Sequence, residues 1–171
     1  MRALPVLLAA TLALTVAACD RRAAPDKVGQ AAAFKHDLPE DVSGYYIPTT
    51  AVQVGDWRLH HLFLGQVPDF MAWRDGQRTA GFAPIMMEFE AGDKTRRTRL
   101  IPTAYDVTED RVRFEATSRE LGAVSFDGRL DQDALAKARR NLGNQGVVLK
   151  GTLKVGDRTF DGVSMRWWAG D

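Results

Sequence analysis

The sequence contains very little cysteine, and this scarcity limits how the protein can be stabilised. Its 171 residues include a single cysteine, Cys19. A disulfide within the chain is therefore excluded, and so is a metal site built from several thiolates. Any folded domain must be held together by its hydrophobic core alone, and a chain of this length can bury a core of sufficient size.

An excess of charge of one sign is also missing. The chain has 23 Lys and Arg residues against 22 Asp and Glu residues, which gives a formal net charge of +1. Binding to nucleic acid depends on basic residues that neutralise phosphates, and attraction to an acidic membrane surface depends on clusters of basic residues. The balance of charge therefore predicts no nucleic-acid partner and no generally polybasic face.

The apolar stretch at the start of the sequence is short for a membrane-spanning helix. It carries no charge from Ala3 to Ala18, whereas a helix needs about 20 apolar residues to cross a bilayer. Arg2 precedes the stretch, and the small residues Ala17 and Ala18 end it. This layout is typical of a secretory signal peptide, which we predict over residues 1–18.

The cysteine follows this stretch directly, in the sequence Val16-Ala17-Ala18-Cys19. A branched apolar residue, two small residues and a cysteine resemble the lipobox of bacterial lipoproteins. The resemblance implies cleavage before Cys19 and lipidation of Cys19, so that several acyl chains hold the protein on the periplasmic side of the inner or outer membrane. Two alternatives stay open, an ordinary signal peptide cut after Ala18 and an uncleaved anchor.

Residues 19–42 are predicted to be the lipidated cysteine and a flexible tether. The segment contains Pro25 and Pro39, an alanine cluster at 31–33 and scattered charges, with few large apolar side chains. A short helix in such a segment would be only marginally stable in water. We therefore expect the segment to act as a spacer between the membrane and the folded domain.

Residues 43–171 are predicted to form one small β domain. Apolar residues such as Val112 and Phe114 alternate with charged ones, and turn-forming residues separate about seven or eight such runs. The run over 97–107 is interrupted by Pro102, which indicates an edge strand or a bulge. The pattern predicts a mainly β fold, a single antiparallel meander with the architecture of a calycin-like barrel.

One helix is predicted late in the chain, directly after the strand that ends at Leu130. Asp131 is a suitable N-cap because its carboxylate accepts a free backbone N–H at the positive end of a helix. Leu135 and Ala138 fall on one side of the helix, and Gly143 is suited to end it. The earlier stretch 68–73 is compatible with either a helical turn or a short strand.

The sequence lacks the motifs of catalysis and metal binding. It has no Gly-x-Ser-x-Gly and no dinucleotide-binding fingerprint. Its three histidines are His36, His60 and His61, and adjacent residues of a regular strand point to opposite faces, so His60 and His61 are not expected to hold one ion. Glu88 and Glu90 are expected to be solvated. We therefore expect no metal, no cofactor and no enzymatic activity.

Aromatic residues and arginines mark a candidate surface for a protein partner. The irregular stretch 66–77 is predicted to be a protruding loop that exposes apolar side chains, and such residues are enriched at binding interfaces. Two arginines on one face of a strand either dock an acidic partner or protect a sheet edge from aggregation. The predicted contact residues are Phe70, Met71, Trp73, Arg97 and Arg99.

Three functions are compatible with the sequence. The first is a lipid-anchored periplasmic module that binds a protein partner without catalysis, as an assembly component, an inhibitor or an immunity protein. The alternative is a lipocalin-like carrier of a lipid or another apolar molecule, with a cavity lined by Trp57, Phe63, Met87, Phe89 and Phe114. The third is an enzyme whose site would require polar groups clustered in a cleft.

Overall fold

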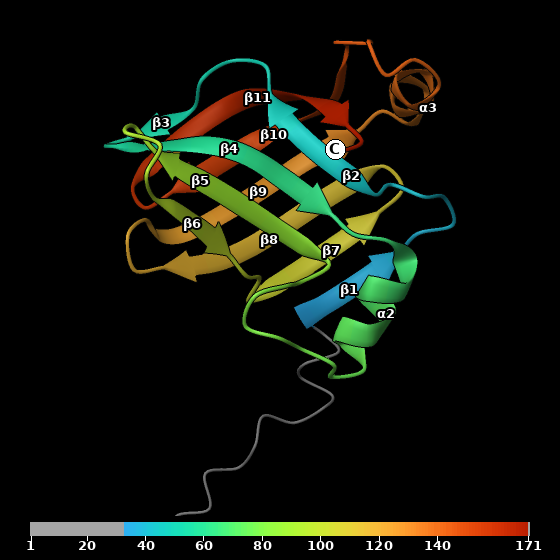
Figure 1. The fold of residues 1–171 in the computed structure, drawn as a ribbon. Coiled ribbons are helices and arrows are strands. Elements are labelled where there is room, and N and C mark those ends of the chain that lie inside the picture. The colour runs from blue at the N-terminus through green and yellow to red at the C-terminus, as the bar shows by residue number, and fades with distance from the viewer. Residues whose placement is uncertain (1–32, 171) are drawn as a thin grey trace, which may run out of the picture.

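Eleven strands form one curled sheet within residues 33–170, the part of the chain that the computed structural model describes (Figure 1). The strands are β1 (Phe34–Asp37), β2 (Gly44–Pro48), β3 (Gln53–Val54), β4 (Trp57–Leu64), β5 (Ile85–Ala91), β6 (Arg97–Leu100), β7 (Ala104–Thr108), β8 (Arg111–Ser118), β9 (Gly122–Leu130), β10 (Val147–Val155) and β11 (Arg158–Trp168). The helices α2 (Val67–Arg74) and α3 (Gln132–Arg140) lie at the rim of the sheet.

Two antiparallel meanders make up most of the sheet. Strands β7 to β11 pair in sequence order, and β2, β4, β5 and β6 form the second series. The two series are joined where β11 pairs with β2, which places Trp167 opposite Tyr46. The sheet curls around one hydrophobic core (Figure 1). The prediction of a mainly β, barrel-like domain with a late helix is confirmed.

The number of strands is larger than the seven or eight predicted. Pro102 divides the run over 97–107 into β6 and β7, because proline has no N–H to donate to a ladder and holds φ near one value. The two-residue strand β3, which pairs with β4, was too short to recognise from alternation. The remaining additional strand is β1.

Strand β1 corrects the predicted boundary between the tether and the domain. It pairs in parallel with β7, so that Phe34 lies opposite Tyr105. The Phe34 side chain is 7% exposed and packs against the rings of Tyr105 and Trp73, with centroids 5.3 and 6.2 Å away. The domain therefore begins no later than Phe34, so the range 19–42 is too long for the tether, and the sheet is not wholly antiparallel.

Helix α2 occupies the stretch predicted to be a protruding loop. Its first turn is closed by Asp69, whose carboxylate accepts a hydrogen bond of 2.8 Å from the Gln66 backbone N–H. Phe70 and Trp73, three residues apart on one side of the helix, are 0% and 4% exposed. The helix thus covers the core beside β1 and β7, and its aromatic residues face inward.

Helix α3 is the predicted late helix. The Asp131 carboxylate accepts a hydrogen bond of 2.9 Å from the backbone N–H of Ala134, as an N-cap does. Leu135 and Ala138 are buried, at 1% and 2% exposure, and fix the helix against the sheet. The helix ends at Arg140, before Gly143.

The end of β11 separates the core from the outer face of the sheet. Trp167 and Trp168 are adjacent and therefore point to opposite faces. Trp167 is 9% exposed, and its indole N–H donates a hydrogen bond of 3.0 Å to the Ser43 carbonyl. Trp168 packs on the outer face against Tyr45, with ring centroids 5.4 Å apart. The candidate site described next lies on this outer face.

Candidate functional site

A bulge in β4 brings two neighbouring histidines to the same face of the sheet. The pairing of β4 with β5 shifts register between Leu59 and His61, which leaves His60 as the extra residue. Leu59 and Leu62 are both buried, although residues three apart in a regular strand point to opposite faces. Because the bulge absorbs this mismatch, His60 and His61 both point outward. This corrects the expectation that they occupy opposite faces.

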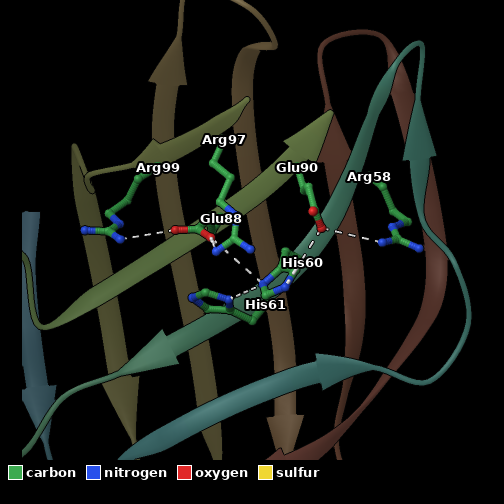
Figure 2. A network of polar contacts seen from close by, with 7 residues as sticks. All are labelled: Arg58, His60, His61, Glu88, Glu90, Arg97 and Arg99. Atoms are coloured by element: carbon green, nitrogen blue, oxygen red, sulfur yellow. Dashed lines mark hydrogen bonds and ion pairs between the residues drawn. The ribbon is translucent and has the colours of Figure 1, made fainter. Parts of the chain in front are cut away.

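The two imidazole rings contact each other directly (Figure 2). Nδ1 of His60 lies 2.7 Å from Nδ1 of His61, so one of these nitrogens donates a hydrogen bond and the other accepts it. Desolvation by burial lowers the pKa of His61 to about 4, against the opposing effect of the Glu88 carboxylate. His61 is therefore neutral at pH 7.

Two glutamates of β5 are buried beside the histidines. Glu88 and Glu90 are 3% and 5% exposed, which corrects the expectation that they are solvated. Buried carboxylates require charged or hydrogen-bonding partners. Arg97 and Arg99 of β6 each donate a hydrogen bond of 3.2 Å to a different oxygen of Glu88. Glu90 pairs with Arg58 at 3.5 Å.

His60 lies between the two carboxylates (Figure 2). Its Nδ1 is 3.9 Å from Oε1 of Glu88, and its Nε2 is 4.0 Å from Oε2 of Glu90. His60, His61 and Glu88 together offer three potential metal-ligand atoms that lie within 4.8 Å of one another. The network therefore combines imidazole nitrogens, buried carboxylates and exposed guanidinium groups on one face.

Four aromatic residues lie next to this polar network, and we refer to them as the outer aromatic cluster. Ring centroids are 5.2 Å apart between Tyr45 and Phe63, and 5.9 Å apart between Phe63 and Phe82. Trp168 completes the cluster through its contact with Tyr45. The ring of Tyr45 also meets the ring of His61, with centroids 5.0 Å apart. Aromatic and polar residues therefore form one continuous surface.

The surface is hollowed into an open pocket of about 740 Å³. The outer aromatic cluster lines it together with both histidines, Glu88, Arg97 and Arg99. A second hollow of about 500 Å³ adjoins it, because Tyr45, Phe63 and Phe82 line both. The pocket thus offers apolar walls beside charged groups, the composition expected of a site for a partner or a ligand.

Phe82 is held in place by the loop that joins α2 to β5. The Thr79 hydroxyl accepts a hydrogen bond of 3.1 Å from the Phe82 N–H. Arg99, which also binds Glu88, donates a hydrogen bond of 3.2 Å to the carbonyl of Gly81. The polar network therefore positions part of the outer aromatic cluster.

The structure separates the five predicted contact residues. Arg97 and Arg99 line the pocket and are exposed. Phe70 and Trp73 are core residues of α2, so they do not form an exposed surface as predicted. Met71 is 46% exposed on α2, but it does not line the pocket. The sequence signal for the shared face of His60 and His61 is the spacing of Leu59 and Leu62. A strand that buries two residues three positions apart must contain a bulge between them.

The predicted lipidation site, Cys19, lies outside the described residues. Within residues 33–170, neither helix is long and apolar enough to cross a bilayer.

Comparison with known proteins returned no match, whether to family models, to curated proteins or to solved structures.

Proposed function

We propose that this protein is a lipid-anchored protein of the bacterial cell envelope whose β domain binds a protein partner and catalyses no reaction. The lipobox-like sequence ending at Cys19 supports the anchor. The open pocket lined by the outer aromatic cluster is the observation that supports partner binding. Aromatic residues and arginine are the side chains that contribute most to the free energy of protein–protein binding.

The charges around the pocket favour a partner segment that carries a carboxylate. Arg97 and Arg99 contribute two positive charges, and Glu88 contributes one negative charge. Arg58 and Glu90 balance each other, so the pocket retains one excess positive charge. A segment with an aromatic or aliphatic side chain next to an Asp or Glu matches both the apolar wall and this charge.

The carrier alternative has no comparable observation in its favour. A cavity for an apolar molecule was predicted beside Met87, Phe89 and Phe114, and each of these side chains is 0% exposed. A side chain that borders a cavity large enough for a small molecule would retain accessible surface. Phe63, also predicted to line that cavity, instead belongs to the outer face.

A comparison of two apolar side chains with similar exposure tests the proposed surface. Phe82 is 42% exposed within the pocket, and Met71 is 46% exposed on α2. The full chain is purified in detergent from cell envelopes after cross-linking, and captured proteins are quantified by mass spectrometry. We expect the native chain and the Met71→Ala variant to capture one protein in stoichiometric amount. The Phe82→Ala variant should capture at least about tenfold less of that protein.

Two results would contradict the proposal. Equal capture by Phe82→Ala and the native chain would remove the pocket as the contact surface. Stoichiometric lipid in place of any protein would support a carrier.

A further inference from the structure

The side chains of His60, His61 and Glu88 form a cluster of potential metal ligands, which binding to a protein partner does not by itself require. Their three potential ligand atoms lie within 4.8 Å of one another, and all three residues line the open pocket. Figure 2 shows the two imidazoles in contact with each other, with His60 also facing the Glu88 carboxylate. We propose that these residues bind one divalent transition-metal ion, with zinc as the ion that fits best.

The chemistry of the donors favours zinc. Two imidazole nitrogens and one carboxylate oxygen are a common set of three protein ligands for zinc, with the fourth position left for water or another molecule. Neutral imidazole and carboxylate also suit copper, nickel and cobalt, which makes cobalt a usable spectroscopic substitute. A site for calcium or magnesium would be built mainly from oxygen ligands, and this cluster has only one carboxylate.

The distances require only small movements on binding. Bonds of about 2.0–2.1 Å in a tetrahedral zinc site place the ligand atoms about 3.3 Å apart. The two Nδ1 atoms are 2.7 Å apart, and Nδ1 of His60 is 3.9 Å from Oε1 of Glu88. Each of these two distances therefore differs by about 0.6 Å from the separation that a zinc ion requires, and the ligand atoms of all three residues lie within 4.8 Å of one another. The ion replaces the hydrogen bond that now joins the two imidazoles.

The surrounding residues orient the ligands. Nε2 of His60 lies 4.0 Å from Oε2 of Glu90, so that a proton on Nε2 would face a carboxylate when Nδ1 binds the ion. A histidine whose second nitrogen faces a carboxylate is a recurring arrangement around zinc. Arg97 and Arg99 fix the Glu88 carboxylate, at the cost of added positive charge that weakens binding.

The direct test is a titration of the full chain, purified in detergent without a histidine tag and freed of metal with a chelator. We expect one zinc ion per chain by calorimetry, and visible absorption bands of tetrahedral cobalt when Co²⁺ is used. His60→Asn, His61→Asn and Glu88→Gln are each expected to weaken zinc binding by at least about tenfold. The matched control is His36→Asn, which replaces the remaining histidine of the chain and should leave the affinity unchanged.

A measurement on the native chain keeps the test valid if a variant fails to fold. Nitrogen-15 spectra of the imidazoles should show Nδ1 coordination at two of the three histidines when zinc is added. The proposal is overturned if zinc does not bind with one-to-one stoichiometry, if the affinity is unaffected by the three ligand variants, or if the spectra show coordination by His36.

Discussion

Glu88 has two arginine partners, although one would balance its charge. Arg97 and Arg99 approach different oxygens of a carboxylate that is 3% exposed. Each arginine is itself exposed to solvent, so losing one guanidinium leaves Glu88 still paired. The cost of burying this carboxylate therefore becomes visible only when both partners are removed.

This redundancy predicts a non-additive loss of stability. The double variant Arg97→Gln/Arg99→Gln should lower the free energy of unfolding by about 2 kcal/mol, and by more than the sum of the two single variants. Urea unfolding at pH 7 with a metal chelator present measures the four free energies.

The chain contains a matched control for this prediction. Arg111 and Arg113 also both pair with one carboxylate, that of Asp127, but the Asp127 side chain is 49% exposed. Replacing both of these arginines with Gln should cost less than about 1 kcal/mol, because exposed ion pairs contribute little. Similar losses in the two double variants would show that the burial of Glu88 is not what makes its partners important.

At the scale of single elements, β1 is short but is held by a large aromatic side chain. Four residues of β1 pair with β7, and Phe34 fills the space between Tyr105 and Trp73. Lys35, the next residue in the strand, points to the opposite side and is exposed. The strand therefore depends on one buried residue more than on its length.

Phe34→Ala should accordingly lower the free energy of unfolding of the full chain by about 3 kcal/mol, the usual cost of removing a buried phenylalanine ring. Lys35→Ala, in the same strand, should change it by less than about 0.5 kcal/mol. Chemical unfolding followed by tryptophan fluorescence measures both. A loss below about 1 kcal/mol for Phe34→Ala would indicate that β1 adds little to the stability of the domain.

At the scale of the whole molecule, the attachment to the membrane that we propose would depend on one residue, Cys19. Cys19→Ser removes the only thiol of the chain and should abolish labelling by radioactive palmitate in a bacterial host. Ala18→Gly keeps a small residue before the cysteine and should preserve labelling. Membrane fractionation and the mass of the mature protein complete the measurement. A native chain that is cleaved but unlabelled would support the ordinary signal peptide instead.

The architecture was largely predictable from local patterns. Alternation of apolar and charged residues identified most of the strands, and Asp131 with the apolar residues that follow it identified α3. Strand β1 was missed because four residues with one buried side chain resemble a linker in sequence. Helix α2 was one of two alternatives for the stretch 68–73, and the burial of Phe70 and Trp73 was missed because these residues are equally compatible with an exposed loop when their packing partners are unknown.

The candidate site was much less predictable, although its residues were visible. Arg97 and Arg99 were recognised as a basic pair, but their shared partner Glu88 is assigned only by the pairing of β5 with β6. His60 and His61 were assigned to opposite faces because a regular strand was assumed. The bulge that brings them to one face depends on which leucines of β4 face the core, and this is decided by the packing of the whole sheet.

By itself, the sequence determined the composition of the site, the class of fold and the lipobox-like motif at Cys19, because each is carried by residues close together in the chain. Only the tertiary structure decided that His60, His61 and Glu88 meet, and that Tyr45, Phe82 and Trp168 share one surface. Strand register and the inward or outward choice at each position arise from packing the entire core, so residues far apart in sequence decide them together.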